Sequence, residues 1–415
     1  MEIRPFACVR PAPQLAARVA ALPYDVYDRA EAAAAARAER LSFLNIDRPE
    51  TQFPPERDMY APEVYAKARA LLDAQVADGT YVEDPDCAFY LYRLTWRGRA
   101  QTGFVACCPL GAFLDGTVKR HENTRPEKVA DRTRHIEALD AQTGPAFLAF
   151  RGTPALDEIA ARACADEPLY DFEADDGVRH TVWRVGDPAE VAAVGRAFAE
   201  VPCAYIADGH HRTAAAVDVG RARCASEGAG DAADGDPGAQ GVLSVLFPAD
   251  QLAILPYNRV VRDLAGHDVA GFVSELCRAG FLVTVEDGPV EPEERGVFGL
   301  FAGNAWWRLT APERLTAQDD PVRRLDASIL QKHVLGPLLG IDDPRASDRV
   351  AFVGGIRGTA ELERLVREGT WAAAFSMHPT SIDELFAVAD AGLLMPPKST
   401  WFEPKLRSGL FIHRI

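Results

Sequence analysis

The chain has 415 residues, and its 45 Lys and Arg against 61 Asp and Glu give a formal net charge of −16. Apolar residues make up 48% and charged residues 26%, which are ordinary globular values and exclude a disordered or collagen-like chain. The acidity argues against a nucleic-acid or anionic-membrane partner, because such surfaces need many cations facing phosphates.

Cysteine usage and the N-terminal segment indicate the compartment. The start, MEIRPFACVRPAPQ, has no apolar core of signal-peptide length, and no later run approaches the roughly 18 apolar residues that span a bilayer. None of the eight cysteines falls in a CxxC pair or a zinc-type Cys/His spacing. We therefore expect a cytoplasmic protein with free thiols and no membrane partner; its oligomeric state is left open.

Hydrophobic periodicity and turn residues predict alternating strands and helices. Predicted strands lie at residues 3–9, 88–94, 102–108, 204–207, 242–247 and 252–255, and the chain ends in another. Predicted helices lie at 30–40, 62–77, 126–138, 154–166, 188–200, 213–226, 268–279, 326–338 and 359–368. The Gly/Asp/Ala-rich stretch 227–240 predicts a flexible surface loop.

This alternation predicts an α/β fold with mixed sheets. One hydrophobic core would be unusually large at this length, so we expect several subdomains. We place them at 1–150, 151–265 and 266–415, with the chain's tail returning to the site.

The sharpest local pattern is YIADGHHRTAAA at 205–216. Gly209 lets the backbone turn tightly after a short strand, and the first turn of the next helix exposes free N–H groups. His210, His211 and Arg212 add side-chain donors. The pattern predicts a phosphate site without a P-loop, since GxxxxGK[ST] is absent from the sequence. Alternatively, Asp208 only caps the helix and the histidines fill surface or core.

A second pattern is VKRHENT at 118–124. His121, Glu122 and Thr124 provide a general base, a metal or proton partner and a hydroxyl group. The alternative is a solvated, basic helix start.

A third pattern is PPKSTWFEPKLR at 396–407, with Lys398, Ser399, Thr400 and Lys405. Four of the chain's six lysines fall in the second and third patterns or on the helix that follows the second. Lysine is a compact point charge suited to phosphoryl oxygens. The alternative is an ordinary C-terminal turn and strand.

Weaker candidates for the rim of a site are Tyr24 with Asp25, the segment 47–50 (DRPE), and Asn258 with Arg259. Each follows an apolar stretch and ends on polar residues. Any junction between a strand and a loop has the same appearance.

Eight short segments occur in the following order between about residue 3 and about residue 410: RPFACVRP, LPYDVYD, FLNIDRPE, FYLYRL, VKRHENT, YIADGHHRTAAA, PYNRVV and MPPKSTWFEPKLRSGL. Together they resemble a bacterial family called domain of unknown function 1015. The family name carries no assigned activity. The family is also similar to proteins often encoded beside phosphoglycerate dehydrogenase and phosphoserine aminotransferase, which implies phosphoserine chemistry.

The turn at 209–212 is also similar to the phosphate-binding turn of the ParB/sulfiredoxin superfamily, which includes free-serine kinases. Those kinases have an Asp-Gly-His-x-Arg pattern that Asp208 to Arg212 match, so the resemblance implies a ParB/sulfiredoxin-like core that binds nucleotide phosphates. Sulfiredoxins carry a reactive cysteine where this chain has His210, so sulfinic-acid reduction is not expected. ParB proteins add a helix-turn-helix module and a basic surface, neither of which this sequence suggests.

The leading hypothesis is an enzyme that transfers or cleaves a phosphoryl group on a small metabolite, with serine or O-phosphoserine as the named substrate. The turn at 208–212 would bind phosphates, with His210 and His211 as further catalytic candidates. Lys398, Ser399, Thr400 and Lys405 would hold the transferred group, and His121 with Glu122 would act as acid/base pair. The predicted substrate contacts are Tyr24, Asp25, Thr124, Asn258 and Arg259.

The expected cofactors are a nucleotide, ATP or ADP, and Mg²⁺ held through phosphate oxygens with Asp25 and Glu122. One alternative is a nucleotide-binding regulatory protein without turnover. Another is a structural protein in which these motifs only cap helices.

Overall fold

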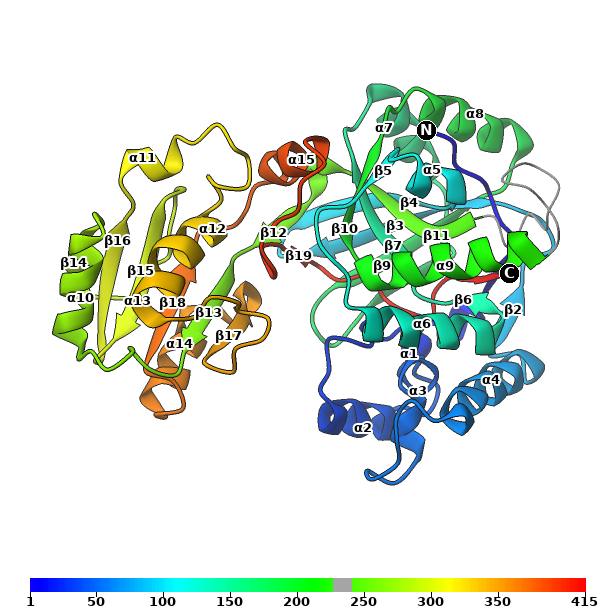
Figure 1. Cartoon of the computed structure of the whole chain (residues 1–415). Helices are drawn as coiled ribbons and strands as arrows, with labels where there is room; N and C mark the ends of the chain where they lie inside the picture. The colour runs from blue at the N-terminus through cyan, green and yellow to red at the C-terminus, as the bar shows by residue number, and fades with distance from the viewer. Residues whose placement is uncertain (227–240) are drawn as a thin grey trace. The chain divides into compact units, whose positions relative to one another are not determined.

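The computed structural model describes residues 1–226 and 241–415, so the loop predicted at 227–240 lies outside the described residues. The chain forms two compact units (Figure 1). The first consists of Met1–Arg120, Thr124–Leu252 and Pro404–Ile415, and the second of His121–Asn123 and Ala253–Glu403.

The first unit contains strands and helices in alternation. Its strands are β1 (Cys8–Pro11), β2 (Tyr81–Glu83), β3 (Phe89–Trp96), β4 (Arg99–Pro109), β5 (Val118–Lys119), β6 (Ala141–Gln142), β7 (Ala146–Phe150), β8 (Tyr170–Glu173), β9 (Arg179–Val185), β10 (Ala204–Asp208), β11 (Gly241–Pro248) and β20 (Ile412–Arg414). Its α-helices are α1 (Ala16–Val19), α2 (Arg29–Ala38), α3 (Leu44–Asp47), α4 (Pro62–Ala77), α5 (Leu110–Leu114), α6 (Pro126–Leu139), α7 (Pro154–Ala163), α8 (Pro188–Ala199) and α9 (His210–Ser226). Short 3₁₀ turns are η1 (Pro13–Leu15), η2 (Pro49–Gln52) and η3 (Ala249–Gln251).

An eight-stranded mixed sheet forms the centre of the first unit, in the order β5-β10-β7-β11-β4-β3-β9-β8. Strand β10 runs parallel to β5 and antiparallel to β7, whereas β7 and β11 are parallel. From β11 to β8, each successive pair of strands is antiparallel. Strands β3 and β4 form the predicted hairpin, which turns on Arg97 and Gly98, both with positive φ as a two-residue turn of this kind requires.

A second, antiparallel sheet of the first unit has the order β2-β1-β20-β6. It joins the start of the chain to its end, because β20 pairs with β1. The tail Pro404–Ile415 is therefore part of the first unit.

Helices α4, α6, α7 and α8 each carry a proline in the first turn, where a missing N–H costs no hydrogen bond. Helix α6 packs against α9 on one side and α4 on the other (Figure 1). Alanine and valine side chains of α9 join aromatic residues of the large sheet and α8 in one core, including Phe104, Phe150 and Phe198. The core positions α9 so that its first turn follows directly from β10.

The second unit contains the remaining elements. Its strands are β12 (Ala253–Leu255), β13 (Tyr257–Val261), β14 (Leu282–Glu286), β15 (Val297–Ala302), β16 (Ala305–Thr310), β17 (Val350–Gly354), β18 (Ala373–Met377) and β19 (Trp401–Glu403). Its helices are α10 (Val269–Arg278), α11 (Glu313–Thr316), α12 (Asp326–Leu330), the π-helical turn η4 (Gln331–Leu335), α13 (Gly336–Leu339), the 3₁₀ turn η5 (Gly355–Arg357), α14 (Gly358–Arg367) and α15 (Ile382–Asp390).

Six strands of the second unit form an antiparallel sheet in the order β14-β16-β15-β18-β13-β17. Its core contains Phe272, Phe281 and Phe298, together with aliphatic residues of α12 and α13. Strands β12 and β19 form a separate two-stranded sheet.

The predicted mixed α/β class is confirmed. The structural units differ from the predicted divisions, since residue 150 lies at the end of β7, inside the large sheet. Helix α9 begins at His210 instead of the predicted residue 213, so His210, His211 and Arg212 form its first turn. Within the described part of the chain, no helix combines the length and the apolar character that a membrane crossing requires.

Candidate anion-binding site

The junction of β10 and α9 forms a tight turn. The register of β10 against β7 shifts between Ile206 and Asp208, and Gly209 follows with φ +84°. The carbonyl of Gly209 accepts hydrogen bonds from Thr213 N at 2.9 Å and Thr213 Oγ1 at 3.0 Å. Gly209 thus precedes the first turn of α9, and its carbonyl accepts the first hydrogen bonds of the helix.

Arg212 lies folded back against this turn. Its side chain is buried, and Nη1 donates to the carbonyl of Pro145 at 3.2 Å. Its Nε is buried without a hydrogen-bond partner among the described residues. A Cβ at Gly209 would meet Arg212 Nη2 at 2.8 Å, and one at Gly144 would meet Arg212 Cδ at 3.1 Å. The two glycines therefore make room for the guanidinium group.

Asp208 lies between two cations. Its Oδ2 is 3.5 Å from Lys405 Nζ and 3.7 Å from Arg212 Nη2. Burial opposes ionisation of this carboxyl group, but Lys405, Arg212 and His210 outweigh it and lower its pKa to about 2. The carboxylate is therefore charged at neutral pH, and Lys405 is held at the turn by the returning tail.

His211 connects the start of α9 to the start of α6. Its Nε2 accepts a hydrogen bond from the backbone N–H of Arg125 at 3.0 Å, so the ring is neutral in this arrangement, with the proton on Nδ1. Thr124, the residue before Arg125, is half-buried.

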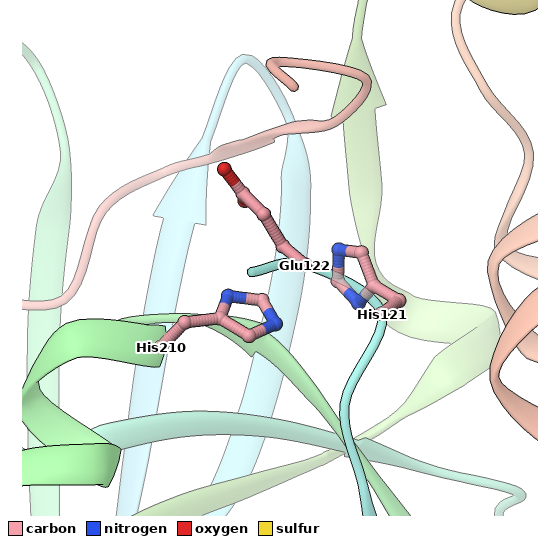
Figure 2. Close-up of side chains that lie close together, drawn as sticks. All are labelled: His121, Glu122 and His210. Atoms are coloured by element: carbon pink, nitrogen blue, oxygen red, sulfur yellow. The ribbon is translucent and has the colours of Figure 1, made fainter. Parts of the chain in front are cut away.

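His121 and Glu122 follow β5, and Figure 2 shows their side chains with that of His210 at the start of α9. Each of the three offers one ligand atom, and these atoms all lie within 4.8 Å of one another. His121–Asn123 groups with the second unit, while Arg120 and Thr124 on either side of it belong to the first. The sequence predicted Asp25 and Glu122 as metal ligands. Among the described residues, Glu122 belongs to this group of three, whereas Asp25 is exposed and does not.

The predicted residues Lys398, Ser399 and Thr400 lie in the second unit. Lys398 has φ +58° and places Nζ 5.5 Å from the ring centre of Tyr257. Its carbonyl accepts from Arg259 Nη2 at 3.1 Å. Ser399 Oγ donates to the carbonyl of Pro396 at 2.7 Å, and Thr400 Oγ1 is 3.4 Å from His121 Nε2.

Asn258 and Arg259 both have internal partners. Asn258 Oδ1 accepts from the backbone N–H of Met377 at 3.0 Å, and the buried Arg259 contacts the carbonyl of Lys398. Burial lowers the pKa of Arg259 to about 10, so it remains a cation at neutral pH. These contacts fix the segment around Lys398.

A pocket in the first unit contains residues that the sequence patterns did not place together. Tyr24 lies there with Arg132, His135, Thr143 and Arg212. Arg132 and His135 share the face of α6 that carries the buried Ile136 and Leu139. In the sequence, Arg132 and His135 fall at helical spacing within the apolar face of this helix, and that pattern indicates buried polar side chains.

The fold and the turn together define a mixed α/β protein with a strand–glycine–helix junction at Asp208–Arg212. The chain belongs to the family described as "Protein of unknown function (DUF1015)", whose model matches residues 3–328. This confirms the predicted family.

Solved structures with similar folds include a free serine kinase in complex with AMP, at 14% identity and a TM-score of 0.35, over 72% of this chain and 86% of the other. SbnI with a C-terminal truncation from Staphylococcus aureus has 12% identity and a TM-score of 0.40, over 74% and 87%. A conserved hypothetical protein from Pyrococcus furiosus has 14% identity and a TM-score of 0.33, over 74% and 95%. No curated protein matches the sequence.

Proposed function

We propose that this chain is a phosphoryl-transfer enzyme that binds the phosphates of a nucleotide at the Asp208–Arg212 turn. The observation that supports this most directly is Arg212, a guanidinium group in the first turn of the 17-residue helix α9. It is only 9% exposed and has a buried N–H without an acceptor among the described residues. An anionic ligand would supply that acceptor at the N-terminus of the helix, whose dipole also favours negative charge.

The proposed reaction joins a hydroxylated small metabolite, with serine as the named candidate, to the terminal phosphoryl group of ATP or ADP. The hydroxyl oxygen attacks phosphorus, and the bond from phosphorus to the bridging oxygen of the nucleotide breaks. The hydroxyl proton passes to His121 or Glu122. Arg212 and Lys405 would stabilise charge on the phosphoryl oxygens, which is the main demand of this chemistry. With water as acceptor, the same groups would cleave a phosphate ester such as O-phosphoserine.

The donor atoms of His121, Glu122 and His210 fit a divalent cation. Two imidazole nitrogens and one carboxylate suit Zn²⁺ or Mn²⁺ better than Mg²⁺, which prefers oxygen ligands. Mg²⁺ would therefore be held by Glu122 and the phosphate oxygens of the nucleotide, where it would neutralise phosphate charge.

Titration calorimetry with ADP tests the binding site. Arg212→Gln should weaken ADP binding at least tenfold, because a charge-assisted contact is removed. Arg221→Gln, an exposed position on the same helix, makes the same change of charge and should leave the affinity unaltered. Equal affinity in all three proteins would contradict the proposed site.

Phosphorus NMR tests turnover, with ATP or ADP plus L-serine in one sample and O-phosphoserine alone in another. His121→Ala should abolish turnover while ADP affinity is retained. If ADP binds to the wild-type protein and none of the samples reacts, the enzyme proposal fails and the alternative of a nucleotide-binding regulatory protein takes its place.

A further inference from the structure

The first unit contains a small polar pocket beside the turn. It is formed by the loop between α1 and α2, by α3, α6 and α9, and by the loop between β6 and β7. The polar residues that line it are Tyr24, Asp47, Arg132, His135, Gln142, Thr143, Arg212 and Thr213. All of them belong to the first unit, so the pocket is a feature of that unit alone.

Arg132 and Arg212 bring two buried guanidinium groups to this pocket, with exposed fractions of 7% and 9%. Arg132 donates from Nε to Asp131 Oδ2 at 3.0 Å and contacts the carbonyl of Asp47 at 3.5 Å. Its guanidinium carbon lies 4.1 Å from the ring centre of Tyr24. A guanidinium group has five N–H donors, so both arginines retain donors for a ligand, and the Nε of Arg212 is buried without an acceptor among the described residues.

Tyr24 is held in place from its backbone. Arg48 Nη1 donates to the carbonyl of Tyr24 at 2.8 Å, and Arg48 Nε is paired with Glu50 at 2.5 Å. All of these side chains are buried. The segment 47–50, predicted as the rim of a site, thus fixes the aromatic ring beneath Arg132.

The other charged groups around the pocket have contacts of their own, and Asp131 takes up two nitrogens of Arg132, Nε and Nη2. Asp131 pairs with Arg132 and also accepts from Tyr65 Oη at 2.8 Å. His135 Nε2 donates to the carbonyl of Ile46 at 2.9 Å, and burial, with Arg132, lowers its pKa to about 4, so it is neutral at pH 7. Asp47 is the remaining carboxylate that lines the pocket, and Asp208 pairs with Lys405 on the other side of Arg212.

The size of the pocket restricts its ligand. Its volume is about 30 Å³, and one water molecule needs about 10–15 Å³ measured in this way. The space therefore accommodates two or three water-sized positions, which suits the three heavy atoms of a carboxylate.

We infer that the pocket binds the carboxylate group of a small hydroxy or amino acid through Arg132 and Arg212. This inference rests on the proposed function, since it makes that acid the acceptor of the phosphoryl group held at the adjoining turn. Arg212 would serve both ligands, whereas Arg132 contacts only the acid. The planar fork of a guanidinium group matches a carboxylate in two parallel hydrogen bonds.

Titration calorimetry on the full chain with three probes tests the inference. Glycerate and L-serine carry a carboxylate and a hydroxyl group, whereas ethanolamine keeps the amine and hydroxyl groups of serine without the carboxylate. Glycerate or L-serine should bind at least tenfold more tightly than ethanolamine. Equal binding of the three probes, absence of binding, or displacement of glycerate by an equal concentration of inorganic phosphate would overturn the inference.

Variants separate this pocket from the nucleotide site. Arg132→Gln should reduce glycerate or L-serine affinity at least tenfold and leave ADP affinity unchanged. If Arg132→Gln does not fold, Thr143→Val, which changes shape little and removes one hydroxyl group of the pocket, should reduce acid affinity severalfold without affecting ADP. If ADP does not bind to the wild-type protein, the proposed function is contradicted. If ADP binds but the affinity for the acid is unchanged in these variants, the proposed carboxylate pocket is contradicted.

Discussion

Gly209 shows how a single residue determines the geometry of the turn. Its φ of +84° lies in the region that glycine adopts readily and other residues do not. The absence of a Cβ also admits the guanidinium group of Arg212, which would lie 2.8 Å from that atom. Two physical demands therefore coincide at one position, and both could be met only by glycine.

Gly209→Ala should destabilise the protein more than a glycine substitution that introduces backbone strain alone. Gly177 is the matched control, because its φ is +74° and a Cβ there would have no neighbour within 4 Å. We expect Gly177→Ala to cost about 1 kcal/mol and Gly209→Ala about 1–2 kcal/mol more, because Arg212 must move. Urea denaturation measures both values, and equal losses would show that Arg212 does not constrain the turn.

His180 is a buried, neutral histidine with a structural role. Its Nδ1 is 2.7 Å from Tyr92 Oη, and its Nε2 accepts from Arg407 Nε at 3.2 Å. Burial, and then the charge of Arg407, lowers its pKa to about 3. Protonation would therefore require an imidazolium ion beside a guanidinium group without solvent.

The free energy of unfolding should fall as the pH decreases from 6.5 towards 3. In this window the unfolded chain binds a proton at His180 that the folded chain does not, so acid favours unfolding by up to about 1.4 kcal/mol per pH unit. Denaturation at a series of pH values measures the slope. His180→Gln should lower the stability at pH 7 and flatten the slope, and an unchanged slope would show that this histidine does not contribute to it.

Helix starts in this chain follow rules that operate within a few residues. The carboxylate of Asp187 accepts hydrogen bonds from the backbone N–H groups of Ala189 at 2.9 Å and Glu190 at 3.2 Å. Pro188 follows in the first turn of α8. This is why the sequence pattern located the start of α8 correctly at residue 188.

Removal of this cap should destabilise α8 by a measurable amount. Asp187→Ala should cost about 1 kcal/mol, because two N–H groups of the first turn lose their acceptor. Asp187→Asn keeps a side-chain oxygen and is the matched control, with a loss of a few tenths of a kcal/mol at most. Thermal unfolding compares the variants, and similar losses for both would assign the effect to charge rather than to capping.

Strands were harder to predict than helices. The β3–β4 hairpin was recognised because its two strands are adjacent in the sequence and turn on a glycine. Strand β9 was missed, although it is central to the pairing with β3 and β8. Of its two partners, β3 is distant in the sequence, so local periodicity carries little information about that pairing.

At the scale of the whole chain, the two units have separate hydrophobic cores. Phe198 packs against Phe104 and Phe150 in the first unit, and Phe298 packs near Phe281 in the second. Each of these cores is composed of residues from one unit only. Separate cores favour separate cooperative transitions on unfolding.

Scanning calorimetry should therefore resolve two transitions. Phe298→Ala should lower the midpoint of one transition, and Phe198→Ala should lower that of the other, since each removes about 3–5 kcal/mol from a fully buried site. The two variants are controls for each other. A single transition that shifts equally in both variants would show that the chain unfolds as one cooperative unit.

Features that depend on neighbouring residues could be predicted directly from the sequence. These include the prolines that open helices, the hairpin at Gly98, and the junction of strand, glycine and helix at Asp208–Arg212. In each case the backbone conformation and its hydrogen bonds are decided within a few residues. The prediction of a mixed α/β fold followed from the same local signals.

Contacts between side chains that are distant in the sequence depend on the complete fold. Lys405 pairs with Asp208 because β20 closes the sheet against β1 and brings the tail into the first unit. Arg132 contacts Tyr24 and lines the same pocket as Arg212 because α6 packs against α9 and buries part of its polar surface. Helical spacing can indicate that Arg132 is buried, but it cannot name the partners of that charge, because the whole fold supplies them.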